Sequence, residues 1–171
     1  MTSSINALPN AEELFQQLSS DIKTFISEHN IKDPLLIGIR TGGAWIAQRL
    51  QEEMALPELG ILDISFYRDD FDERGLSANA KGSELPDSIE DRNIILVDDV
   101  LMSGRTIRAA MNEIFDHGRP ASINLAVLLD IGRRQLPIQA DILGAKLELA
   151  EGKKAKLSGP NPFTLSIKDQ S

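Results

Sequence analysis

The chain has 171 residues, 42% of them hydrophobic, which is enough for one globular domain with a single core and too little for a second full domain. It contains no cysteine, which excludes disulfides, thiolate zinc sites and a cysteine nucleophile, and its net charge of −8 argues against a surface dominated by contacts to nucleic-acid phosphates. The sequence has neither an apolar run of membrane-spanning length nor a signal-peptide pattern, so we expect a soluble cytoplasmic protein with no membrane partner.

The first elements in chain order are a helix, a strand and a second helix. Residues 11 to 28 predict an amphipathic helix because apolar side chains recur at helical spacing, at Leu14, Leu18, Ile22, Phe25 and Ile26. The short apolar run LLIGI, residues 35 to 39, predicts a buried strand. It ends in RTGG, residues 40 to 43, and residues 44 to 54 resume helix-forming composition. The order predicts a strand, a glycine loop and a helix.

A second strand is expected at ILDISFY, residues 61 to 67, because its apolar side chains alternate. The segment that follows, from Arg68 to Asp91, is charged, contains two glycines and lacks periodicity, which predicts a long exposed loop. Loops of this length in compact domains are lids or disordered connections. We expect the flexible part to cover residues 68 to about 88.

The second half of the chain repeats the strand and helix pattern. The apolar run IILV, residues 94 to 97, predicts a third strand, and apolar spacing from Ile107 to Phe115 predicts a helix that Gly118 ends. INLAVLLD, residues 123 to 130, predicts a fourth strand. These repeats indicate an α/β fold with a mainly parallel sheet flanked by helices, whose ligands bind beyond the carboxyl ends of the strands. The loops 40 to 43 and 98 to 106 both lie at that edge.

The last part of the chain, residues 131 to 171, differs in character. Short alternating stretches are separated by glycine and proline, as in ADILGAKLELAEGKKAKLSGPNPF. We expect small antiparallel strands there that form a hood over part of the site. The whole chain, residues 1 to 171, is interpreted as a single domain.

The segment from Asp98 to Thr106 has the residue types that bind a sugar phosphate. SGRT, residues 103 to 106, puts backbone N–H groups and two hydroxyls at a helix start, where the dipole favours an anion, and Gly104 allows close approach. Asp98 and Asp99, expected to be exposed strand-end acids, suit hydroxyl donors or a magnesium ion, and a magnesium-bound ribose 5-phosphate offers both. The alternative is a strand-end turn followed by an ordinary helix cap.

IILVDDVLMSGRT, residues 94 to 106, resembles the signature with which type I phosphoribosyltransferases bind 5-phosphoribosyl-1-pyrophosphate (PRPP). A longer match is similar to the PyrR family, whose members regulate pyrimidine operons and also have uracil phosphoribosyltransferase activity. It covers roughly residues 35 to 144 and consists of GIRTGGAWIAQRL, LDISFYRDD, VDDVLMSGRTIRAAMNEIFDHGRPASINLAVLLD and RRQLPIQAD.

The resemblance implies a set of PRPP-binding residues. The two aspartates would hold the ribose hydroxyls, and residues 102 to 106, called the phosphate loop below, would bind the 5-phosphate. Arg40 and the residues after it match the loop that receives pyrophosphate, and Arg40 can stabilise the charge that grows on the leaving group. The complete set is Arg40, Thr41, Gly42, Asp98, Asp99, Met102, Ser103, Gly104, Arg105 and Thr106.

The reaction implied is attack of a uracil nitrogen on the anomeric carbon of PRPP, with pyrophosphate leaving through a cationic transition state. The loop from Arg68 to about Ser88 would close over PRPP, with Tyr67 and Lys81 as further contributors. Mg²⁺ would bridge PRPP oxygens and keep several waters, so we expect few direct protein ligands. The catalytic residues implied are Arg40, Asp98, Asp99 and Arg68.

Base choice rests on Met102 and on two positions of the tail. In 6-oxopurine members of this fold an aspartate precedes the Ser or Thr of the phosphate loop, and Met102 occupies that place here. This difference favours a pyrimidine, held through backbone groups near Ile131 and Ala155. PyrR members usually have arginine at the positions of Gly42 and Ile131, so this chain departs from the family pattern at both.

Three functions follow as alternatives. The first is a uracil phosphoribosyltransferase that forms UMP, the second a PRPP- or UMP-responsive RNA-binding regulator with weak or vestigial catalysis, and the third a phosphoribosyltransferase for another base. RNA binding is disfavoured because the helix of residues 11 to 28 has Lys23 as its only Lys or Arg. The resemblance implies a homo-oligomer, either a dimer or a tetramer. A basic set in the tail is interpreted as solvated surface: Arg133, Arg134, Lys153, Lys154 and Lys156.

Overall fold

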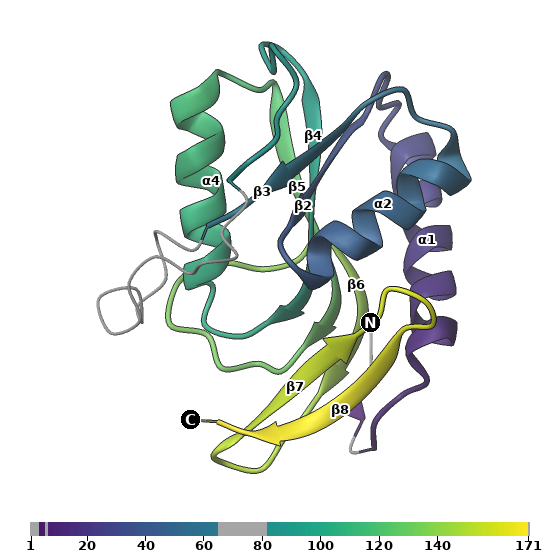
Figure 1. The fold of residues 1–171 in the computed structure, drawn as a ribbon, viewed down its shortest axis with the longest axis vertical. Coiled ribbons are helices and arrows are strands. Elements are labelled where there is room, and N and C mark those ends of the chain that lie inside the picture. The colour runs from purple at the N-terminus through teal and green to yellow at the C-terminus, as the bar shows by residue number, and fades with distance from the viewer. Residues whose placement is uncertain (1–3, 6, 65–81, 171) are drawn as a thin grey trace.

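The computed structural model describes residues 4–5, 7–64 and 82–170. A six-stranded parallel sheet in the order β1-β6-β5-β4-β2-β3 forms its centre, and β7 and β8 form a separate antiparallel hairpin (Figure 1). The helices are α1 (Ala11–Glu28), α2 (Gly42–Met54) and α4 (Arg105–His117). The strands are β1 (Ser4–Ile5), β2 (Leu35–Ile39), β3 (Leu59–Leu62), β4 (Asn93–Leu101), β5 (Ser122–Asp130), β6 (Ile142–Leu147), β7 (Lys153–Ser158) and β8 (Thr164–Asp169).

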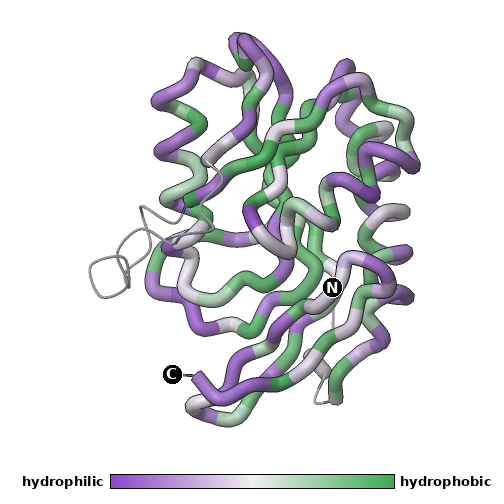
Figure 2. Tube along the Cα trace, in the orientation of Figure 1, coloured by the Kyte–Doolittle hydropathy of each residue, from purple (hydrophilic) through white to green (hydrophobic). Residues whose placement is uncertain are grey.

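The sheet has a hydrophobic core on each face. The core on the side of α1 and α2 takes Leu36 and Ile95, and the core under α4 takes the neighbouring residues Leu35 and Ile94. Because both faces are covered, β2 and residues 94–97 of β4 are apolar at every position, which is why their runs predicted strands. Figure 2 shows these strands as hydrophobic segments between helices of mixed hydropathy. The expected α/β fold with a mainly parallel sheet is confirmed.

The register of the sheet brings two predicted site segments together. Leu35 pairs with Ile94 and Gly38 with Val97, so the carboxyl end of β2 lies beside the point where β4 reaches Asp98. Both strands run in the same direction, so the chain leaves each of them at the same edge of the sheet. The RTGG and SGRT segments therefore meet at that edge, although they are far apart in the sequence.

Two predicted boundaries at this edge are wrong. β4 does not end at Val97 but continues to Leu101, so Asp98 and Asp99 belong to the strand and not to a loop. The extension is stabilised by β5, whose residues pair with β4 as far as Leu101 with Asp130. The glycines of RTGG are not a loop either, because α2 begins at Gly42.

The hood is shorter than expected, because β6 belongs to the main sheet. β6 pairs in parallel with β5 on one side and with β1 on the other. The glycine that indicated a break, Gly144, lies inside β6, where a Cβ would approach the Leu128 carbonyl oxygen to 2.3 Å. The antiparallel strands expected in the tail are confirmed as β7 and β8, and the name hood is kept for residues 153–169.

The strand expected at residues 61 to 67 is described only in part. β3 begins two residues earlier, at Leu59, and ends at Leu62. Residues 65–81 lie outside the described part of the chain, and they include Tyr67, Arg68 and Lys81.

Phe163 connects the hood to α1. Its ring is buried, and its centroid lies 5.5 Å from that of Phe15. The guanidinium carbon of Arg49 lies 4.0 Å from the Phe163 centroid and 4.7 Å from the Phe15 centroid. Arg49 also donates hydrogen bonds to Glu12 and, at 3.0 Å, to the Pro160 carbonyl oxygen. The hood is thereby held on the helical layer by aromatic packing and one shared cation.

Replacing Phe163 with alanine should lower the free energy of unfolding by about 3–5 kcal/mol, because a buried ring is replaced by a cavity. Phe115→Ala is the matched control, since Phe115 is 58% exposed, and it should change stability by no more than about 0.5 kcal/mol. Urea denaturation followed by circular dichroism measures both. Equal losses in the two variants would contradict the docking of the hood through Phe163.

Candidate functional site

Two adjoining cavities lie at the carboxyl edge of the sheet. The α2 cavity, of 490 Å³, is lined by residues 39–42 and by Lys156 and Leu157 of the hood. The α4 cavity, of 340 Å³, is lined by residues 100–107 and by residues of the tail. Asp98, Val100 and Thr106 line both, so the two spaces meet above the end of β4. All the predicted PRPP-binding residues lie along this double cavity.

The glycines at the start of α2 allow the helix to approach β4 closely. A Cβ on Gly43 would lie 2.5 Å from the Val97 carbonyl oxygen. A Cβ on Gly42 would lie 2.3 Å from Oδ2 of Asp99, so this carboxylate occupies the space that a side chain at position 42 would need. Neither glycine has a positive φ angle, and their role here is close packing rather than backbone freedom.

Two helix N-termini border the double cavity. α2 begins after Thr41, whose side chain accepts no hydrogen bond from the first turn, and α4 begins after Gly104, which has no side chain. The Arg105 amide at the start of α4 donates to Ser103 Oγ at 3.1 Å. Gly104 has a φ of 93°, a left-handed conformation that favours glycine. Helix N-termini direct unsatisfied N–H groups and a partial positive charge outward, and each can bind a phosphate group. The arrangement suits a ligand with anionic groups at both ends.

The two aspartates between these helix ends differ in burial. Asp98 is only 5% exposed, which corrects the expectation that both acids are exposed, and Asp99 is half-buried. Asp98 Oδ1 accepts a hydrogen bond of 2.8 Å from the Asp99 amide, and Asp99 Oδ1 accepts one of 2.7 Å from the Val100 amide. Each carboxylate is thus oriented by the backbone of its own strand, next to the shared part of the cavities.

Arg40 connects the end of β2 to the segment that begins at Gly82. Its Nη2 donates to the Gly82 carbonyl oxygen at 3.3 Å and lies 3.8 Å from Oε1 of Glu84. Its Nε is buried, and no group in the described part of the chain accepts a hydrogen bond from it. The peptide bond between Arg40 and Thr41 is cis. A buried donor without a partner is costly, so the Nε position suits an anionic ligand in the α2 cavity.

The two predicted base-binding residues do not line either cavity. Ile131 is buried in the core on the side of α1, and its amide donates to the Leu101 carbonyl oxygen at 3.0 Å. Ala155 packs against the same core from the hood. Sequence reasoning missed several residues that do line the cavities, among them Trp45, Val100, Leu157, Gln135 and Gln170.

The basic set of the tail is largely engaged inside the molecule. Arg133 donates to the carbonyl oxygens of Lys153, Leu149 and Ala150, and Lys153 pairs with Asp169. Arg134 pairs with Asp130. Lys156 lines the α2 cavity rather than a separate surface. Of the five cations in the set, Lys154 alone has no role in these contacts or in the cavities, so the set forms no patch of its own.

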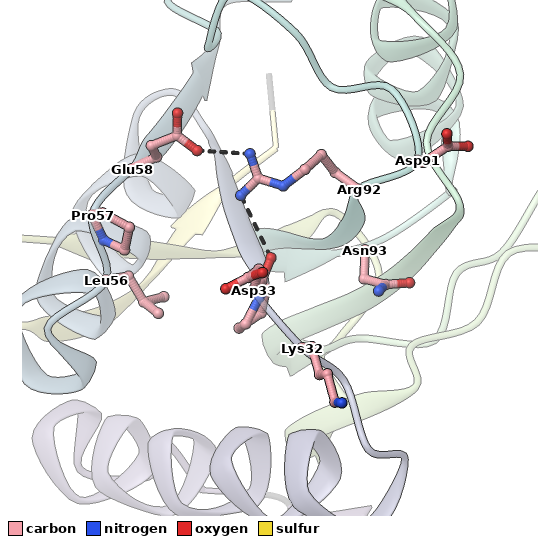
Figure 3. A pocket seen from close by; sticks show the side chains of 9 residues that line it. Lys32, Asp33, Leu56, Pro57, Glu58, Asp91, Arg92 and Asn93 are labelled. Carbon is pink, nitrogen blue, oxygen red and sulfur yellow. Dashed lines mark hydrogen bonds and ion pairs between the residues drawn. The ribbon is translucent and has the colours of Figure 1, made fainter.

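A further cavity of 490 Å³ lies at the opposite, amino edge of the sheet, where Pro34, Pro57 and Asn93 are among its lining residues. Figure 3 shows the Arg92 side chain extending between Glu58 and Asp33. Its Nη1 donates to Glu58 Oε2 at 2.7 Å, and its Nη2 lies 3.5 Å from the Asp33 carbonyl oxygen. This cavity contains no pair of helix N-termini, and Arg92 connects the strand starts there.

The described residues contain neither a metal-binding cluster nor a membrane-spanning helix. In the ranges 4–5, 7–64 and 82–170, no group of three or more His, Cys, Asp or Glu side chains could hold a metal ion. The helices of the same ranges include none that is both long and apolar enough to cross a membrane.

The chain is similar in sequence to a known domain family and to known proteins. Residues 1–152 match the family described as phosphoribosyl transferase domain. Bifunctional protein PyrR of Pseudomonas syringae pv. tomato is 52% identical over 166 residues, which cover 96% of this chain and 98% of that protein. Bifunctional protein PyrR of Pseudomonas entomophila is 52% identical over 164 residues, which cover 95% of each chain.

Solved structures share the fold at low identity. A hypoxanthine phosphoribosyltransferase from Staphylococcus aureus has a TM-score of 0.64 at 21% identity and covers 88% of this chain and 81% of its own. An HGPRT-ase from Leishmania tarentolae has a TM-score of 0.60 at 19% identity, with 86% and 84% covered. The resemblance found in the motifs is therefore confirmed, and the chain belongs to the phosphoribosyl transferase domain family and, within it, to the PyrR family of bifunctional proteins.

Proposed function

We propose that this protein is a uracil phosphoribosyltransferase that forms UMP and pyrophosphate from uracil and PRPP. The observation that carries the proposal is the pair of helix N-termini on either side of Asp98 and Asp99, each at its own cavity. PRPP has a phosphate monoester at one end, a pyrophosphate at the other and a ribose with two hydroxyls between them. The order of the groups in the ligand matches the order of the sites.

In this assignment the phosphate loop takes the 5-phosphate at the start of α4, and Asp98 and Asp99 take the ribose hydroxyls. The α2 cavity takes the pyrophosphate, where Arg40 Nε supplies a buried donor and Thr41 a hydroxyl. Lys156 adds a second cation at this end, because it lines the same cavity from the hood. A site with two cations and a helix N-terminus is suited to a multiply charged anion.

The reaction forms a bond between a uracil nitrogen and the ribose anomeric carbon and breaks the bond from that carbon to pyrophosphate. The bonding electrons leave with pyrophosphate, and the attacking nitrogen loses its proton. Positive charge grows on the ribose in the transition state, and the carboxylates of Asp98 and Asp99 lie where they stabilise it. Arg40 stabilises the opposite charge, which grows on the leaving group.

Mg²⁺ bound to PRPP would neutralise part of the pyrophosphate charge. The donor set of the site fits such an ion, because two neighbouring carboxylates, Asp98 and Asp99, attract a hydrated cation. We therefore propose that PRPP oxygens and water supply most of the ligands. Asp98 and Asp99 would contribute hydrogen bonds to the ribose and the negative charge that favours the cation.

Uracil is favoured over a 6-oxopurine by the residue at position 102. The phosphate loop has Met102 where 6-oxopurine members of the fold have an aspartate, so this position offers no carboxylate for proton transfer at a purine. Val100 lines both cavities and gives the ring an apolar surface where they meet. Ile131 and Ala155 stay proposed as neighbours of the base through the backbone around them.

A second function, in RNA-binding regulation, is favoured by the name of the relatives, which are called bifunctional. The described charges offer it little support, because Arg133, Arg134 and Lys153 are engaged internally and Lys23 pairs with Glu53 at 3.8 Å. No UMP formation together with tight binding of pyrimidine-leader RNA would replace the first proposal by this one. We also propose a homo-oligomer, a dimer or a tetramer, as the PyrR resemblance implies.

Incubation with PRPP, Mg²⁺ and radiolabelled base should convert uracil to UMP and leave hypoxanthine unreacted. The physical reason is the missing carboxylate at Met102. Release of pyrophosphate, measured in parallel, should equal UMP formed. Turnover of hypoxanthine in preference to uracil would establish a different base and refute the uracil assignment.

Asp98→Asn and Asp99→Asn should each lower kcat/KM by roughly 10²-fold or more, because a charge that stabilises the transition state is removed. Asparagine is chosen because Asp98 is buried and accepts a backbone amide, so alanine would leave a cavity and an unpaired donor. Asp116→Asn, at the exposed end of α4, is the control and should keep full activity. Wild-type kinetics in both site variants would refute the assignment of the two aspartates.

Lys156→Met should raise the KM for PRPP about tenfold, the effect of roughly 1.4 kcal/mol, because one cation is removed from the pyrophosphate end. Lys154→Met is the matched control. It lies two residues away on the same face of β7 and does not line the cavities, so its KM should change less than about twofold. Steady-state kinetics at fixed Mg²⁺ measures both. An equal effect of the two lysines would indicate nonspecific attraction.

A further inference from the structure

Three consecutive carbonyl groups before α4 accept hydrogen bonds from one neighbouring segment, residues 130–136. The Leu101 oxygen accepts from the Ile131 amide at 3.0 Å. The Ser103 oxygen accepts from the amides of Gln135 and Leu136, at 2.9 Å and 3.1 Å. The Met102 oxygen accepts from Nη1 of Arg134 at 2.7 Å, which makes this the one bond of the series that a side chain donates.

These bonds fix the direction of the amides in the phosphate loop. In a trans peptide unit the N–H group points away from the C=O group of the same unit. Because the Met102 oxygen is held toward residues 130–136, the Ser103 N–H is directed away from them. The Ser103 oxygen fixes the Gly104 N–H in the same manner. The phosphate loop lines the α4 cavity, and N–H groups whose direction is fixed in this way are suited to bind an anion.

Arg134 is itself held by a buried acid at the end of β5. Its Nη2 donates to Asp130 Oδ2 at 2.6 Å and its Nη1 to Asp130 Oδ1 at 3.1 Å, which is a bidentate pair. Asp130 is buried, and its Oδ1 also accepts the Gly132 amide at 2.8 Å. Each Nη atom has two hydrogens, so Nη1 can serve Asp130 and Met102 together. The planar fork leaves the guanidinium little freedom.

We infer that Arg134 is a positioning residue for the 5-phosphate of PRPP. It holds the peptide unit between Met102 and Ser103 so that the Ser103 N–H faces the phosphate monoester, and Asp130 holds Arg134 in that position. The inference rests on the proposed function, because it needs the phosphate loop to take the 5-phosphate. Arg134 touches neither the substrate nor the reacting atoms, and it acts through the backbone alone.

A purely structural role for the ion pair is the competing explanation, and Arg92 gives a matched control for it. Arg92 and Arg134 have the same side-chain exposure, 24%, and each pairs with a carboxylate. Arg92 lies in the amino-edge cavity that Figure 3 shows, and it lines neither the α2 cavity nor the α4 cavity. Arg92→Met removes an ion pair without touching the phosphate loop, so it reports the loss of an ion pair elsewhere in the fold. Its partner Glu58 is 46% exposed and Asp130 only 7%, so Arg134→Lys, which keeps a cation beside Asp130, is needed as a second variant.

The test compares two anions that occupy different ends of the site. Isothermal titration of the full-length protein with ribose 5-phosphate probes the phosphate loop, and titration with magnesium pyrophosphate probes the α2 cavity. Arg134→Met should weaken ribose 5-phosphate binding about tenfold and change pyrophosphate binding less than about twofold. A tenfold loss is the effect expected when one hydrogen bond from a charged group is removed. Arg92→Met should leave both affinities within about twofold of wild type.

Arg134→Lys keeps the protein testable if methionine at this position prevents folding, because an ammonium still neutralises Asp130. It lacks the planar fork, so ribose 5-phosphate should still bind at least about threefold more weakly than to wild type, with pyrophosphate binding unchanged. In kinetics the KM for PRPP should rise while kcat at saturation stays near wild type. A raised KM with an unchanged kcat indicates that the phosphate loop is misplaced. A general loss of folded protein would instead lower the active fraction, and with it the apparent kcat, at an unchanged KM.

Wild-type affinity for ribose 5-phosphate in a folded Arg134 variant would overturn the inference, and so would equal weakening of both anions. If the wild-type protein forms UMP, these outcomes leave the proposed function in place. If the wild-type protein neither binds ribose 5-phosphate nor turns over PRPP, the proposed function fails and this inference fails with it.

Discussion

The close approach of α2 to the end of β4 is the constraint on which the rest of the site depends. Only a residue without a side chain fits where Gly43 meets the Val97 carbonyl oxygen, because the atoms around that position belong to the backbone of β4. This contact brings a helix N-terminus beside two acids of a neighbouring strand. With bulkier residues the helix start would move outward, and the α2 cavity would lose the wall that it shares with Asp98 and Asp99.

Positive and negative groups have a fixed arrangement along the site. Cationic groups and helix N-termini lie at its two ends, and the two carboxylates lie between them at the meeting point of the cavities. A net charge of −8 for the whole chain is compatible with anion binding, because the positive groups are local and partly buried. Backbone amides supply much of the positive potential, and they do not appear in a count of charged residues.

The sequence alone predicted those strands and helices whose residue pattern depends only on residues nearby in the chain. Apolar runs such as LLIGI predicted strands, and SGRT before an apolar helical stripe predicted the start of α4. Pairing over a distance could not be read in this manner. β4 extends through Asp98 because β5 pairs with it, and β6 joins the sheet although Gly144 indicated a break. The charges of Arg133 and Lys153 were interpreted as solvated surface because their partners are distant in the sequence.

The parallel pairing also has a consequence for how the chain reaches its folded state. In the described part of the chain, no two neighbouring strands of the central sheet form a hairpin, and Leu35 must pair with Ile94 before the edge with both cavities exists. Loop closure precedes contact formation in such topologies, which makes their folding slow compared with that of helical bundles. A ligand that occupies both ends of the completed site binds the native chain and not the unfolded one, so the concentration of that ligand would contribute directly to the free energy of unfolding.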